Sequence, residues 1–151
     1  MELKDIMTRN VTTIPQDMNV RDAAKMLVKM EISGLPVVDE ENMLVGMITE
    51  KDIIRMALPK YVEKLGSLAY TFDMVPFSKT LAEADKVLVK EIMRKKVITT
   101  TVDTSIPEVA RIMIVKQVRR IPILDPEDNR MIGIVARHDI VKEVFEESES
   151  F

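Results

Sequence analysis

The chain contains no cysteine and no tryptophan, and it has one histidine and four glycines among its 151 residues. Without cysteine it cannot form disulfides, iron–sulfur clusters or zinc sites with thiolate ligands. The single histidine, His138, has no second imidazole with which to hold a metal. A glycine-rich phosphate loop is missing, and no Ser–His–Asp set or carboxylate pair stands at a catalytic spacing. We therefore predict a protein that is not an enzyme and has neither a metal site nor a catalytic cofactor.

Long hydrophobic runs are missing as well, because a charged residue interrupts every apolar stretch before the ~20 residues that a membrane span needs. The N-terminal MELKDIM lacks the basic region and the apolar stretch of a secretory signal. We therefore expect a cytoplasmic protein without a membrane partner. The net charge of −3 provides no general basic field for nucleic acid. Basic residues gather only at Arg94–Lys96 and Arg119–Arg120, which leaves nucleic-acid binding as a disfavoured alternative.

What the chain does contain is an internal repeat, in which residues 3–54 reappear as residues 89–141. Pro36 aligns with Pro122 (122 − 36 = 86), and Gly46 aligns with Gly133 (133 − 46 = 87), so one residue is inserted in the turn between them. A unit of about 50 residues is too small to bury a good core alone. The two copies are therefore expected to pack together around a pseudo-twofold axis.

Both copies show the same order of short apolar strands and amphipathic helices, which is strand, helix, strand, strand, helix. In the first copy we expect strands at 11–14, 35–38 and 44–48, a helix that begins near Asp17 or Asn19 and is closed by Gly34, and a helix at 50–57. In the second copy we expect strands at 97–102, 121–124 and 132–135, a helix capped by Ser105, and a helix at 137–147. This order predicts an α/β fold.

The repeat also sets the expected domain boundaries. The first motif takes residues 1–58, the second takes residues 89–147, and residues 148–151 form a frayed tail. Residues 59–88 belong to neither copy and contain four of the six aromatic residues. We interpret them as an ordered connector, with a mobile lid over a ligand as the alternative.

The two copies resemble a tandem pair of CBS motifs, which is known as a Bateman module. The most specific segments are GMITEKD and GIVARHD, with DIM and EIM leading the copies. The resemblance implies two βαββα units that pack through their sheets. It also implies clefts that hold adenine nucleotides or S-adenosylmethionine, a regulatory role, and a homodimer.

The spacing of Thr49 and Asp52 places them at a strand end and in the first turn of the next helix. A carboxylate there can accept hydrogen bonds from both hydroxyls of a ribose, or it can simply cap its own helix. The resemblance favours the ribose contact, and Met47 would then offer an apolar surface to adenine. Arg119 and Arg120 suit a phosphate by charge and by the fork geometry of guanidinium, although a solvated helix end is the alternative.

By the same resemblance, the ligand that Asp52 contacts would reach the arginines of the other repeat. His138 would also reach a phosphate or stay exposed and idle. The full set of residues predicted for this ligand site is Met47, Thr49, Asp52, Ile98, Arg119, Arg120 and His138.

The second cleft is predicted to be weaker. Asp139 is present there, but Thr49 aligns with Ala136, and the two arginines align with Ser33 and Gly34. The residues assigned to this cleft are Thr12, Ser33, Ile134 and Asp139. We therefore expect one adenine nucleotide per chain, held by a non-catalytic regulatory module with an unknown downstream protein. The alternatives are a ligand-free structural dimerisation module and an S-adenosylmethionine sensor.

Overall fold

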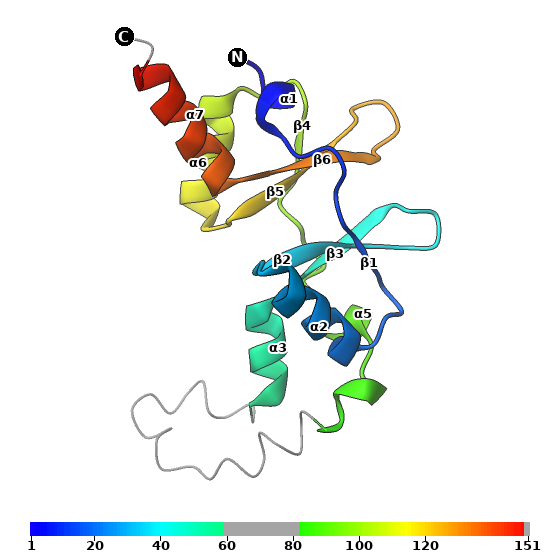
Figure 1. Ribbon diagram of the computed structural model, residues 1–151. Helices are drawn as coiled ribbons and strands as arrows, with labels where there is room; N and C mark the ends of the chain where they lie inside the picture. The colour runs from blue at the N-terminus through cyan, green and yellow to red at the C-terminus, as the bar shows by residue number, and fades with distance from the viewer. Residues whose placement is uncertain (59–81, 150–151) are drawn as a thin grey trace. The chain divides into compact units, whose positions relative to one another are not determined.

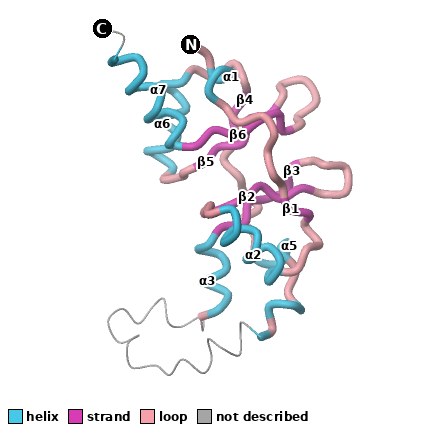
Figure 2. Tube along the Cα trace, in the orientation of Figure 1, coloured by secondary structure: helices cyan, strands magenta, loops and turns pink. Residues whose placement is uncertain are grey.

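The computed structural model describes residues 1–58 and 82–149. These residues form two three-stranded sheets, one with strand order β1–β2–β3 and one with strand order β4–β5–β6, each accompanied by helices (Figures 1 and 2). The predicted α/β class is therefore confirmed. Two compact units contain these sheets, and each is described here by itself. The first-repeat unit comprises residues 13–41, 45–58 and 82–96, and the second-repeat unit comprises residues 1–12, 42–44 and 97–149.

In the first repeat, β1 (Ile14–Pro15) leads to α2 (Val20–Met30), β2 (Gly34–Val38), β3 (Leu44–Thr49) and α3 (Glu50–Ala57). Asn19 caps α2, because its side-chain oxygen accepts a hydrogen bond from the Asp22 N–H at 2.9 Å. β1 pairs with β2 in parallel over two residues only. The predicted strand at 11–14 is therefore shorter and later than expected, and Pro15 lies within it.

The second repeat follows the same order with β4 (Thr100–Thr101), α6 (Ile106–Lys116), β5 (Arg120–Leu124), β6 (Met131–Ala136) and α7 (Arg137–Glu149). Ser105 caps α6 as predicted, and Pro107 lies in the first turn, where its missing N–H costs nothing. β5 and β6 form an antiparallel hairpin in which Arg120 stands opposite Ala136. α7 continues to Glu149, two residues beyond the predicted end of this helix.

One expectation about helix ends was wrong. Gly34 does not close α2 but begins β2, and the residue that ends the helix is Glu31, which has a left-handed conformation with φ of 55°. Gln117 ends α6 with the same φ. The helical spacing of apolar residues predicts Met30 on the buried face of α2, together with Val20, Ala23 and Leu27, yet Met30 is 40% exposed. The buried face of α2 consists of Val20, Ala23 and Leu27.

Each repeat begins with a four-residue helix, α1 (Leu3–Ile6) or α5 (Val89–Ile92), that packs in the unit of the other repeat. In the second-repeat unit, α1 contacts α7, and Thr8 exchanges two backbone hydrogen bonds of 2.9 Å with Ile134 of β6 (Figure 1). In the first-repeat unit, α5 contacts α3, and Arg94 exchanges two backbone hydrogen bonds of 2.9 Å with Met47 of β3. Each sheet is thus extended by a segment that belongs to the other sequence repeat.

The segment before α5 is held by further contacts. It contains a short 3-10 helix, η3 (Ala84–Lys86), which contacts α2. The Lys90 ammonium lies 2.9 Å from a carboxylate oxygen of Asp17, and this hydrogen bond together with the opposite charge raises the pKa of Lys90. The prediction of an ordered connector at residues 59–88, with a mobile lid as the alternative, concerns mainly residues 59–81, which lie outside the described residues.

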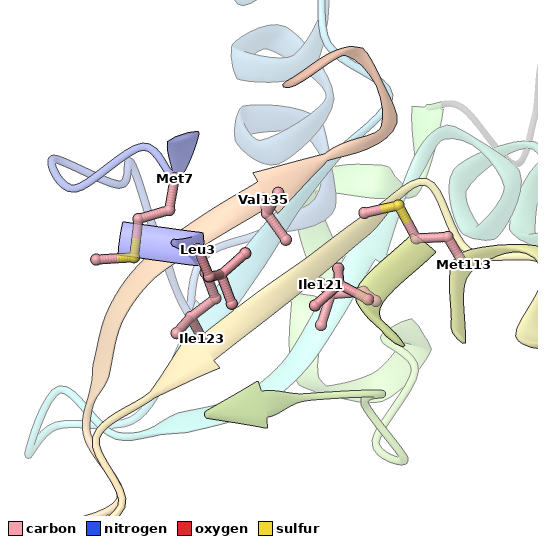
Figure 3. Close-up of a cluster of buried hydrophobic side chains, with 7 residues drawn as sticks. Leu3, Met7, Met113, Ile121, Ile123 and Val135 are labelled. Carbon is pink, nitrogen blue, oxygen red and sulfur yellow. The ribbon is translucent and has the colours of Figure 1, made fainter. Parts of the chain in front are cut away.

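Each unit has its own hydrophobic core, and each core includes side chains from the short helix, α1 or α5, that belongs to the other sequence repeat. Figure 3 shows the core of the second-repeat unit, in which Leu3 and Met7 lie among side chains of the β5–β6 hairpin and Met113 of α6. Its buried members are Leu3, Met7, Val109, Met113, Ile121, Ile123 and Val135. In the first-repeat unit, Val89 of α5 takes the equivalent place. The buried members there are Ile14, Ala23, Leu27, Leu35, Val37, Ile48 and Val89.

Candidate functional site

Thr49 and Asp52 meet where β3 ends and α3 begins, as their spacing predicted. One carboxylate oxygen of Asp52, Oδ2, accepts hydrogen bonds from the Thr49 N–H and the Thr49 hydroxyl, each at 2.9 Å. The Asp52 N–H in turn donates to the Thr49 hydroxyl oxygen at 3.3 Å. The two residues therefore form a reciprocal capping box, which satisfies the N–H groups of Thr49 and Asp52 at the start of α3.

These hydrogen bonds show what the Thr49 hydroxyl does in the turn. Its hydrogen is donated to Asp52, so the hydroxyl fixes the orientation of the carboxylate rather than pointing its hydrogen at a ligand. Among the described residues, nothing donates a hydrogen bond to the second carboxylate oxygen of Asp52, Oδ1. A half-buried carboxylate with one oxygen committed and one available can accept hydrogen bonds from neighbouring hydroxyl groups of a ligand. Capping and ligand binding are thus compatible at Asp52.

Met47 lies two residues before Thr49 in β3, and its side chain is 9% exposed. Its backbone is paired on one side with Arg94, the first residue of the basic segment Arg94–Lys96. All three residues of that segment are exposed. This place beside Met47 was not predicted from the sequence, because the pairing joins residues from different repeats.

In the second-repeat unit, the residues predicted to face phosphate lie at the start of β5. Arg119 is exposed, and Arg120 is half-buried at the first position of the strand. His138 is exposed in the first turn of α7. Arg137, for which the sequence predicted no role, connects these two places. Its N–H donates to the Arg119 carbonyl oxygen at 3.0 Å, and its side-chain Nε donates to the Val118 carbonyl oxygen at 3.1 Å.

Asp139 occupies in this unit the place that Asp52 has in the other. Its Oδ2 accepts a hydrogen bond from the Ala136 N–H at 2.8 Å, but Ala136 has no hydroxyl to hold the carboxylate. Ile134 is half-buried in β6 and pairs with Thr8. Two further candidates, Thr12 and Ile98, lie in the segments before β1 and β4, where Thr12 is exposed and Ile98 is half-buried.

Ser33, the remaining candidate, belongs to the first-repeat unit and is half-buried. Its carbonyl oxygen accepts a hydrogen bond from the Glu50 N–H at 2.9 Å. This bond matches the one from the Arg137 N–H to the Arg119 carbonyl, because Glu50 aligns with Arg137 (137 − 50 = 87). The same alignment could have singled out Arg137 from the sequence, since it replaces an acidic residue by a basic one beside the arginine pair.

The structure therefore brings Met47, Thr49 and Asp52 together in one unit and Arg119, Arg120 and His138 together in the other. Within residues 1–58 and 82–149, no three potential metal-ligating side chains gather in one place. In the same ranges, no helix combines the length and apolar character needed to cross a membrane.

Comparison with known proteins identifies the two repeats. The family model described as CBS domain matches residues 3–58 and again residues 89–146. The chain is 31% identical over 153 residues to the Methanocaldococcus jannaschii protein MJ1426, an alignment that covers 94% of this chain and 90% of that protein. It is also 32% identical over 138 residues to inosine-5'-monophosphate dehydrogenase of the same organism, and there it spans 91% of this chain but 22% of the enzyme.

Solved structures show the same fold. The CBS domain pair of protein MJ0100, in complex with 5-methylthioadenosine and S-adenosyl-L-methionine, matches with a TM-score of 0.70 and 29% identity over 97% of this chain and 98% of that one. CBSX2 of Arabidopsis thaliana, in complex with AMP, matches with a TM-score of 0.74 and 23% identity over 97% of this chain and 98% of that one.

Proposed function

The chain belongs to the CBS-domain family as a tandem pair, and from this premise we propose that it is a non-catalytic regulatory module that binds one adenine nucleotide. Asp52, oriented by Thr49, accepts hydrogen bonds from the ribose hydroxyls, and Arg119 and Arg120 contact the phosphate. Met47 and Ile98 provide apolar contacts. That one ligand is contacted by both repeats is what the family resemblance implies.

The observation that carries the proposal is the oriented carboxylate of Asp52. Two hydrogen bonds of 2.9 Å from Thr49 hold one oxygen of Asp52, and this leaves the other oxygen with its lone pairs for a ligand. Asp139 in the second repeat lacks the hydroxyl bond. The related MJ0100 pair contains methylthioadenosine and S-adenosylmethionine, both of which carry a ribose.

The choice of a phosphate-bearing ligand rests on the arginines. Guanidinium groups match phosphate in charge and in fork geometry, and neither ligand of the MJ0100 pair carries a phosphate. S-adenosylmethionine is therefore the competing ligand for this site, and a ligand-free dimerisation module is the competing function. The bound ligand favours the conformation of the module that it binds more tightly, and the size of the shift depends on that difference in affinity. The favoured conformation then acts on a partner protein or on the homodimer.

A titration of the purified protein with adenosine, AMP, ATP and S-adenosylmethionine tests the proposal. We expect AMP or ATP to bind more tightly than adenosine or S-adenosylmethionine, with an affinity for AMP that falls as salt is raised. Absence of binding for all four compounds would support the dimerisation module instead.

The double variant Arg119→Gln/Arg120→Gln then separates the phosphate contact from the rest of the site. Two cations attract each added phosphate charge but do not touch the adenosine part in the proposed arrangement. We expect the double variant to reduce the affinity difference between adenosine and AMP while the adenosine affinity changes little. Equal losses for adenosine and AMP would show that the two arginines are structural.

A further inference from the structure

Three arginines come together at one end of the second-repeat unit, and the third of them, Arg137, has no role in the function proposed above. Arg120 begins β5 opposite Ala136, the last residue of β6, and Arg137 follows Ala136 as the first residue of α7. Within the described part of the chain, neither Arg119 nor Arg137 pairs with a carboxylate. Arg137 thus lies next to the two arginines that the proposed function assigns to phosphate.

Arg137 holds the backbone of the turn that presents the arginine pair. Gln117 ends α6 in a left-handed conformation, and the Val118 N–H then donates to the Met113 carbonyl oxygen at 3.2 Å. The next two carbonyl groups, those of Val118 and Arg119, both accept hydrogen bonds from Arg137, at 3.1 Å from Nε and 3.0 Å from the backbone N–H. Arg137 therefore fixes two consecutive peptide groups immediately before Arg120.

The first repeat shows which of these bonds is special to the arginine pair. There Glu31 takes the left-handed conformation, the Ile32 N–H donates to the Leu27 carbonyl at 3.2 Å, and the Glu50 N–H donates to the Ser33 carbonyl at 2.9 Å. The backbone arrangement is thus the same. The carboxylate of Glu50 has no hydrogen to donate, so a side-chain bond like that of Arg137 is available only in the repeat that carries Arg119 and Arg120.

We propose that Arg137 is a positioning residue for phosphate, which holds the 118–120 backbone through its Nε bond and so aims Arg119 and Arg120 at the anion. This inference rests on the proposed function and adds a residue that determines its specificity. The position matters as much as the charge, because a guanidinium fork binds phosphate well only when it is held at the correct angle.

Two variants separate the hydrogen bond from the charge. In Arg137→Gln, the amide nitrogen occupies the same place along the side chain as Nε, so the donor is kept and the charge is lost. In Arg137→Lys, a carbon occupies the place of Nε, so the charge is kept and the donor at that place is lost. Glu50→Gln, at the equivalent position of the first repeat, is the matched control.

The measured quantity is the ratio of the adenosine and AMP dissociation constants, determined by calorimetry at fixed salt. We expect Arg137→Lys to reduce the ratio by about 2- to 12-fold, the effect of one net hydrogen bond. Arg137→Gln and Glu50→Gln should leave the ratio close to that of the unaltered protein. In the ligand-free protein, amide hydrogen exchange over residues 118–120 should accelerate in the Lys variant and not in the Gln variant.

The other possible results for the two Arg137 variants either support or overturn the positioning role. A ratio retained in the Lys variant, or lost in the Gln variant alone, would overturn the positioning role. A ratio lost in both variants supports the role only if amide exchange accelerates in both, and otherwise overturns it. If the unaltered protein itself binds AMP no better than adenosine, the phosphate contact of the proposed function has failed, and the inference fails with it.

Discussion

Asp52 shows how one carboxylate can end a strand-to-helix turn and still serve a ligand. Its Oδ2 accepts hydrogen bonds from the backbone N–H and the hydroxyl of Thr49, and its Oδ1 accepts neither of them. Helix capping alone does not distinguish the two repeats, because Asp139 likewise accepts a hydrogen bond from the Ala136 N–H at the start of α7. What differs between the repeats is the hydroxyl that orients the carboxylate, and this difference predicts unequal ligand sites.

We expect Asp52→Ala to weaken AMP binding far more than Asp139→Ala does. Loss of two hydrogen bonds to a charged acceptor should cost on the order of 2–4 kcal/mol, which is roughly a 30- to 1000-fold loss of affinity. Both variants remove a carboxylate from the first turn of a helix, and Asp52→Ala removes one hydrogen bond more than Asp139→Ala, so the stability cost of each is measured separately by denaturation. Calorimetry with AMP measures the difference, and equal affinities in the two variants would rule out unequal sites.

The residues of the candidate site were predicted from the sequence only in part. The Thr49–Asp52 pair was predictable because a strand end, a hydroxyl and a carboxylate three residues later determine a capping box locally. The direction of the Thr49 hydroxyl was not predictable, because it depends on where the folded turn places the Asp52 carboxylate. Arg137 was missed because its partner, Val118, lies 19 residues away in the chain.

The helices and strands, like the site residues, were predicted from the sequence only in part. Helix starts at Asn19 and Ser105 and both hairpins follow from local patterns of caps, turn residues and apolar strands. The short helices α1 and α5 have four residues each, too few to give a periodic pattern, and contacts with distant segments hold them in place. β1 and β4 were predicted too long, because each of them pairs over two residues only.

The glycines of β3 and β6 explain how the segments that follow α5 and α1, at Arg94 and Thr8, approach these strands so closely. A Cβ on Gly46 would lie 2.9 Å from the Arg94 carbonyl oxygen, and a Cβ on Gly133 would lie 2.9 Å from the Thr8 carbonyl oxygen. Real Cβ atoms do not approach an oxygen this closely, so a side chain at either place would push the segment off the strand. The two glycines are therefore required by the same contact in both units.

We expect Gly46→Ala and Gly133→Ala each to destabilise the protein by about 1–3 kcal/mol, the usual cost of overpacking. The midpoint of urea denaturation measures this loss. Met93→Ala added to Gly46→Ala should restore little, because the Arg94 carbonyl remains in place when the Met93 side chain is shortened. Full recovery in the double variant would show that the methionine, and not the backbone, requires the glycine.

Apolar side chains stay exposed at equivalent places of both repeats. Val28 is 78% exposed and Ile114, its equivalent, is 74% exposed (28 + 86 = 114). Ile54 is 55% exposed and Val141, its equivalent, is 53% exposed (54 + 87 = 141). The neighbouring Ile53 and Ile140 pack against the cores of their own units. The same exposure in both repeats favours a symmetric assembly.

We predict a homodimer whose contact includes Ile54 and Val141. The double variant Ile54→Lys/Val141→Lys places charges in that contact and should yield a monomeric mass by light scattering at micromolar concentration. Lys51→Gln, on the same helix as Ile54 but at an exposed charged position, is the control and should leave the mass unchanged. A monomeric mass for the unaltered protein would contradict the prediction.

The segments that contain α1 and α5 also determine the order in which the protein can fold during synthesis. The first-repeat unit needs Val89 for its core and Arg94 to pair with Met47, and the ribosome makes these residues 42 and 47 positions after Met47 (89 − 47 = 42 and 94 − 47 = 47). α1, made first, must wait for the β5–β6 hairpin and α7, which are made last. Neither repeat can therefore complete its core from its own sequence. A nascent chain or a fragment that stops after residue 58 should expose the apolar surface that Val89 covers, and residues 82–96 supplied as a separate peptide should protect it.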